Sequence, residues 1–113
     1  MRSDTTMRVA RPTDKLALIK EMYMKGLGLS VLAEFVDHEG FDGVILGQSG
    51  NLYHLEFTSH RGHTAGKAPS KDHLWVFYVP DRREWQDSCA RMLTAGFHQV
   101  PSDNPYWDLK MSQ

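Results

Sequence analysis

"RVARPTDKLALIKEMYMKGLGLSVL", residues 8–32, decides the fold predicted for this chain of 113 residues. Its apolar residues alternate before the proline, recur at helical spacing through the middle, and alternate again at the end, which predicts strand, helix, strand. The same order recurs in "VFYVPDRREWQDSCARMLTAGFHQV", residues 76–100. In both copies the glycine after the helix lies sixteen positions beyond the proline before it (Pro12 and Gly28, Pro80 and Gly96). This repeat indicates a duplicated unit.

After its helix the first unit has three predicted strands, and the second does not. Alternating segments at 30–36, 41–46 and 52–58 are joined by the turn sequences "DHEG" and "GQSG". After the second helix only a strand at 97–100 and the start of another in "NPYWDLKM" fit. The predicted fold class is therefore α+β, with two βαβββ modules, the second incomplete. The expected organisation is one compact domain with a flexible N-terminus (1–7), a first module (8–59), a linker (60–72) and a second, incomplete module (73–113).

The composition is that of a soluble globular protein. Hydrophobic residues make up 41% and charged residues 24%, and the net charge is −1. A chain with this net charge has no excess of positive charge to attract nucleic acid or an anionic membrane, so neither is an expected partner. A single cysteine, Cys89, cannot form an intrachain disulfide, and no apolar stretch is long enough to span a membrane. These features predict a cytoplasmic protein.

Five segments in a fixed order carry a resemblance to a known family: "RVARPTDKL", "GLGLSVL", "YHLEF", "LWVFYVPD" and "NPYWD". Together they resemble the vicinal oxygen chelate superfamily, which includes glyoxalase I, bleomycin-resistance proteins and extradiol dioxygenases. The resemblance covers residues 8–108. It implies that the two modules form an open, barrel-like sheet around a ligand cavity, and that the protein is a homodimer. It does not select one function, since this superfamily has many functions on one scaffold.

The resemblance also points to four positions where metalloenzymes of the superfamily bind their ion. Here the first is Arg8, the second Glu56 and the third Leu74 or Val76, while the fourth would fall beyond the last residue. Only Glu56 is a competent ligand, because a guanidinium stays protonated and apolar side chains cannot bind a cation. Sites of this kind need about three protein ligands. We therefore expect no cofactor and no bound metal.

One alternative metal site stays open. His54 and Glu56 are two residues apart on a predicted strand and so lie on one face. If a bulge turned His73 inward, the three side chains could hold a divalent zinc, nickel, manganese or iron ion. The histidines of "HRGH", residues 60–63, are interpreted as linker residues.

Arg8 and Glu56 are expected to face the same cavity from neighbouring strands. Two interpretations are open: the two side chains form a buried ion pair, or Arg8 holds a carboxylate or phosphate of a ligand through two parallel hydrogen bonds. His54 is either a general base or a structural histidine. The predicted ligand-binding residues are Arg8, His54, Glu56, Tyr78, Tyr106 and Trp107.

The aromatic residues divide by the alternation of their strand. Tyr78 has the parity of the cavity, whereas Trp75 and Phe77 have the parity of the helix-facing core. Tyr106 and Trp107 either form a wall of the pocket or cover the exposed end of the second module. No catalytic residue is assigned.

Three functions fit these features. The first is a metal-independent small-molecule binding protein of the glyoxalase/bleomycin-resistance type, with an anionic or aromatic ligand between the modules. The second is a metal-dependent enzyme of the glyoxalase or dioxygenase kind. The third is an interaction module without a small ligand, whose open strand edge binds another chain.

Overall fold

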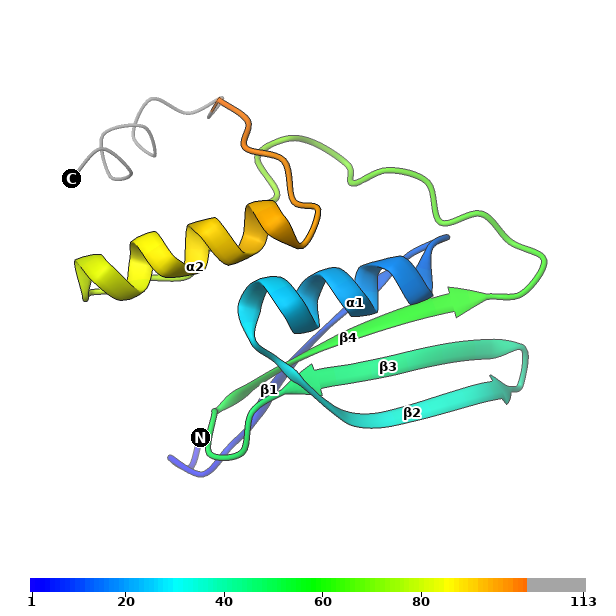
Figure 1. The fold of residues 1–113 in the computed structure, drawn as a ribbon. Coiled ribbons are helices and arrows are strands. Elements are labelled where there is room, and N and C mark those ends of the chain that lie inside the picture. The colour runs from blue at the N-terminus through cyan, green and yellow to red at the C-terminus, as the bar shows by residue number, and fades with distance from the viewer. Residues whose placement is uncertain (102–113) are drawn as a thin grey trace.

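Four strands from the first half of the chain form one mixed sheet in the order β1-β4-β3-β2 (Figure 1). The structure is a computed structural model, and it describes residues 1–101. The parallel pair is β1 and β4, and the other neighbours are antiparallel. The strands are β1 (Met7–Pro12), β2 (Ser30–His38), β3 (Phe41–Gly47) and β4 (Tyr53–His60).

Two helices lie on one side of this sheet. Helix α1 (Leu16–Leu27) covers the sheet, and helix α2 (Arg82–Thr94) packs mainly against α1 (Figure 1). Gly28 ends α1 in the left-handed conformation, with φ of 67°, which a residue without a Cβ adopts at little cost. Asp81 caps α2, since its carboxylate accepts the backbone N–H of Glu84 at 2.9 Å.

The core lies between α1 and the sheet and comes entirely from the first half of the chain. Alternate residues of β4 point toward α1 and are buried while their neighbours are less so, whereas the central strand β3 is buried on both faces from residue 43 to residue 47. Half-buried side chains of α1, among them Ile19 and Tyr23, pack against them. The buried cluster is Leu29, Val44, Leu46, Leu55 and Phe57.

The second half joins this core through aromatic side chains, chiefly Trp75, while Phe97 also packs on Tyr23 with ring centroids 5.1 Å apart. Trp75 packs on Tyr23 and Phe57, with ring centroids 6.1 and 5.7 Å away, and the Arg11 guanidinium lies 4.3 Å from its ring centroid. Burial in this cluster raises the pKa of Tyr23, and the positive charge of Arg11 opposes the increase. Trp75 thus has the predicted core-facing role, whereas Phe77, for which the same role was predicted, is 42% exposed.

The strands predicted at 76–80 and 97–100 are wrong, because neither segment forms a strand in the structure. A strand needs a hydrogen-bonded neighbour, and within residues 1–101 these segments have none. The anchoring of Trp75 lays its segment against the core instead. The rest of the predicted second module, "NPYWDLKM", lies outside the described residues.

The predicted βαβββ order of the first module is confirmed, with strand and helix bounds close to those expected. The two-module barrel around a cavity is not confirmed. What the structure has is a small α+β fold with an open four-stranded sheet and two helices. Neither helix of this described part is long and apolar enough to cross a membrane.

Gly43 generates a test of the sheet. The Phe35 ring of β2 packs directly over it, so a Cβ at position 43 would overlap that ring. Gly43→Ala should therefore lower the free energy of unfolding by about 1–3 kcal/mol, as overpacking does, measured by urea denaturation. In a Phe35→Ala background, Gly43→Ala should lower the free energy of unfolding by clearly less. Equal losses in the two backgrounds would contradict this packing.

Candidate functional site

The candidate site is the open face of the sheet, which we define as the face opposite α1. Because Leu55 and Phe57 point into the core, the alternating residues His54 and Glu56 of β4 point to the open face. Arg8 of the neighbouring strand β1 pairs in register with His54. The structure thus brings together three of the predicted site residues.

Arg8 and Glu56 form a loose ion pair on this face. The Nη1 atom of Arg8 lies 3.7 Å from Oε1 of Glu56, which is beyond hydrogen-bonding distance. The Arg8 side chain is 48% exposed and that of Glu56 is 20% exposed. The pair is therefore not the buried one that the first interpretation described. Within residues 1–101 the guanidinium donates no hydrogen bond, so its donors can bind another group.

His54 lies beside this pair with its ring against β3. Its Cδ2 atom is 2.9 Å from the point where a Cβ of residue 47 would lie, so a glycine is needed there. The Nδ1 atom of His54 is buried and has no hydrogen-bond partner in the part of the chain that the structure describes. Sequence reasoning treated Gly47 only as part of a turn. No local signal distinguishes it from Gly50 in "GQSG".

The other predicted ligand-binding residues are not brought to this face by the described structure. Tyr78 is 71% exposed, in a segment whose Phe77 ring approaches Tyr53 at 6.0 Å. Tyr106 and Trp107 lie outside the described residues.

The alternative metal set does not fit the geometry. His73 is exposed, two residues before Trp75, which packs on the α1 side of the sheet. Among residues 1–101 no group of three or more His, Cys, Asp or Glu side chains could hold an ion. His54 and Glu56 alone give at most two ligands, fewer than a protein site of this kind needs.

The "HRGH" stretch forms an ordered corner at the end of β4. The Arg61 guanidinium donates two hydrogen bonds to Asp42, at 2.9 and 3.0 Å, and lies 3.6 Å from Asp37. The His60 ring stacks between Phe41 and His63, with centroids 4.1 and 3.7 Å away. The two imidazoles lie face to face, so their nitrogens do not converge on one ion.

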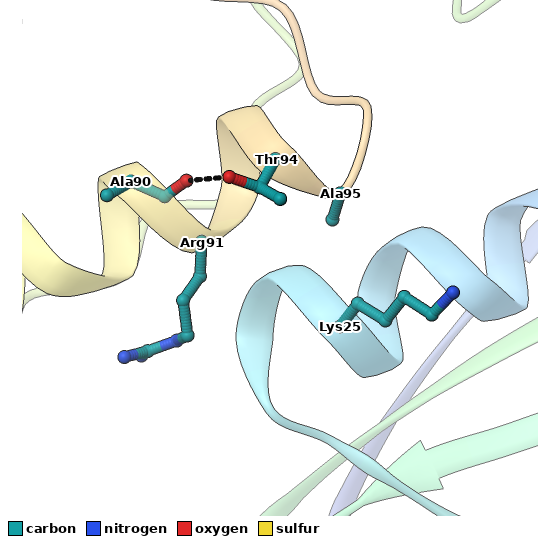
Figure 2. Close-up of a pocket in the computed structure, with 5 residues that line it drawn as sticks. All are labelled: Lys25, Ala90, Arg91, Thr94 and Ala95. Carbon is teal, nitrogen blue, oxygen red and sulfur yellow. Dashed lines mark hydrogen bonds between the residues drawn. The ribbon is translucent and has the colours of Figure 1, made fainter.

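A separate depression lies between the helices, away from the open face (Figure 2). Its volume is about 300 Å³, and it is open to solvent. None of the predicted site residues contributes to it. Its lining residues are Lys25, Ala90, Arg91, Thr94 and Ala95.

The corner at β4 generates a pH-dependent prediction. Hydrogen bonds from Arg61 and from the backbone N–H of Asp37 hold the pKa of Asp42 below its ordinary value of 3.8. A lowered folded-state pKa stabilises the protein above pH 3.8, and that stabilisation is lost as the pH falls through the lowered pKa. Asp42→Asn should therefore be less stable than the wild type at pH 7, with a difference that narrows below pH 3.8 in urea denaturation. Asp4→Asn, at an exposed pair with Arg2, is the control. A difference independent of pH would contradict the prediction.

Known protein families match both halves of this chain. Residues 7–58 match the YycE-like N-terminal domain, and residues 72–112 match the YycE-like C-terminal domain. The chain is 42% identical over 101 residues to the "Uncharacterized protein YycE" of Bacillus subtilis (strain 168), covering 89% of this chain and 73% of that protein.

A solved structure shows the same fold. It superimposes with a TM-score of 0.84 at 40% identity, over 94% of this chain and 77% of the other. It is described as a Bacillus subtilis YycE protein of unknown function, with glyoxalase/fosfomycin resistance protein as a suggested assignment. That description is consistent with a vicinal oxygen chelate fold. With family matches over both halves and a relative at 42% identity, the chain belongs to the YycE-like family.

Proposed function

We propose that this chain is a metal-independent small-molecule binding protein of the glyoxalase/bleomycin-resistance type, and that it holds an anionic ligand on the open face of the sheet. The observation that carries the proposal is the loose contact of 3.7 Å between Arg8 and Glu56. A half-exposed guanidinium with free donors is a ready partner for an anion.

Arginine suits this role because its planar fork offers parallel donors to two oxygens of one carboxylate, phosphate or phosphonate. Its charge does not depend on pH in the range where proteins fold. In the free protein Glu56 balances part of that charge. On binding, the ligand anion takes the place of the Glu56 carboxylate as the counter-charge of Arg8.

The suggested assignment of the solved relative supports an anionic ligand class. Fosfomycin is a small phosphonate, which presents the kind of oxyanion that a guanidinium binds in a bidentate manner. We include it as a probe for that reason, together with inorganic phosphate. The expected homodimer would place a second copy near the open strands and stays a prediction.

Removing the cation tests the proposal directly. A ligand present at about 100 times its Kd stabilises a protein by about 2.7 kcal/mol, which a thermal-shift assay detects as a rise in Tm. Phosphate or fosfomycin should raise the Tm of the wild type, and Arg8→Ala should abolish the rise. Arg2→Ala removes the same charge from an exposed pair with Asp4, and this variant should still show the rise in Tm. An unchanged shift in Arg8→Ala would remove Arg8 from the site. If only divalent metals stabilise the protein, the metal-dependent enzyme is favoured. If no probe stabilises it, the interaction module is favoured.

Removing the counter-charge should have the opposite effect. Glu56→Gln frees the guanidinium and removes a negative charge that repels the ligand. A surface ion pair contributes up to about 1 kcal/mol, so the Kd for phosphate should fall by up to about fivefold in calorimetric titration. Glu21→Gln, which loses a comparable pair with Lys25 on α1, should leave the Kd unchanged. Weaker binding in Glu56→Gln would contradict the prediction and show that the Glu56 carboxylate helps to hold the ligand, for example through a bridging water.

A further inference from the structure

The two ring nitrogens of His54 have different surroundings. Nδ1 is the nitrogen that is buried without a partner. The structure gives His54 no hydrogen bond within residues 1–101, so Nε2 is the nitrogen that solvent reaches. A neutral imidazole carries its proton on one nitrogen and a lone pair on the other. The different surroundings therefore bear on where that proton lies.

Two features place the proton on Nε2. A proton on Nδ1 would be a buried donor without an acceptor, and orphaned buried N–H groups are rare in proteins. In addition, the Cδ2 edge of the ring lies against Gly47 of β3, which turns the Nδ1 edge toward β1. There Arg8 is the register partner of His54, and its positive charge favours a lone pair over an N–H.

We propose that His54 donates its Nε2–H to the ligand beside the guanidinium of Arg8, so that the open face holds a two-donor site for an oxyanion. The inference rests on the proposed function, which it deepens by naming the second contact. Neighbouring strands are about 4.8 Å apart, a separation that one oxyanion can bridge with two hydrogen bonds of about 2.9 Å. The site selects ligands with at least two acceptor oxygens, such as phosphates, phosphonates and carboxylates.

The same tautomer fits the predicted ligand-binding role of His54 and argues against two other roles considered from the sequence, metal ligand and general base. A metal ligand or a general base needs a lone pair on the accessible nitrogen. Here the accessible nitrogen carries the proton, and the lone pair lies on the buried one. His54 is therefore a donor that positions and selects the ligand.

The tautomer can be measured in the wild-type protein without any ligand. Long-range proton–nitrogen correlation spectra of ¹⁵N-labelled protein distinguish a protonated ring nitrogen from an unprotonated one. We expect His54 to show a protonated Nε2 and an unprotonated Nδ1. A proton on Nδ1, or an even mixture of the two tautomers, would overturn the inference.

Two variants separate the donor role from the shape of the side chain. Gln carries an amide N–H₂ near the position of Nε2, whereas Leu carries no donor. His54→Leu should weaken the binding of inorganic phosphate and of fosfomycin about tenfold, and His54→Gln should restore most of it. His98→Leu, at an exposed position beyond α2, is the matched control and should bind like the wild type.

The outcomes distinguish this inference from the proposed function. If His54→Leu binds phosphate as tightly as the wild type while Arg8→Ala does not bind it, the anion site stands and the role of His54 is wrong. If the wild type binds neither probe, the proposed function fails, and the two-donor site fails with it.

Discussion

The alternation of side chains along β4 is the constraint on which both the core and the candidate site depend. Leu55 and Phe57 are buried beneath α1, and this fixes which way the whole strand faces. His54 and Glu56 must then point to the opposite face, because successive side chains of a strand leave it on opposite sides. A register slip by one residue would bury the two polar side chains and expose the two apolar ones. The hydrophobic effect thus positions the polar site.

The core belongs to one half of the chain, and this shapes what the other half can do. Every residue of the buried cluster comes from the segment between Leu29 and Phe57, and α2 has no buried residue. Trp75 and the face of α2 that meets α1 attach the second half to the first. In this arrangement the described second half lies on the helix side, so it leaves the opposite face of the sheet open (Figure 1).

The electrostatics of that open face favour an anion over a cation. Arg8 brings a permanent positive charge to the position where the resemblance to metalloenzymes implies a ligand, and Glu56 compensates it only loosely. His54 adds no negative charge, and its buried Nδ1 leaves Nε2 as the group that meets solvent. In the anion site that we propose, Arg8 and His54 are the two donors and the Glu56 carboxylate is the group that the ligand displaces. The same three side chains make a poor cation site, since a guanidinium would repel the ion.

Prediction from the sequence succeeded where local pattern and local packing agree. The periodicity of residues 8–60 determined the βαβββ order, and the parity of "YHLEF" determined that His54 and Glu56 share a face. These features depend on residues close in the sequence, whose geometry follows from the strand and helix periods. Trp75 was also assigned to the core, but from the alternation of a strand that does not form, and Phe77 of the same parity is 42% exposed.

Only the tertiary structure decided the rest. Residues 76–80 have the composition of a strand, yet a strand forms only where a neighbour supplies its hydrogen bonds, and composition does not show whether one is there. Arg61 and Asp42 are nineteen residues apart, and their contact follows from the pairing of β3 with β4. The need for glycine at position 47, and the burial of one His54 nitrogen, arise where the His54 ring crosses onto the next strand. Such contacts join distant parts of the chain, so their physical cause lies in three-dimensional packing and cannot be read from the order of residues.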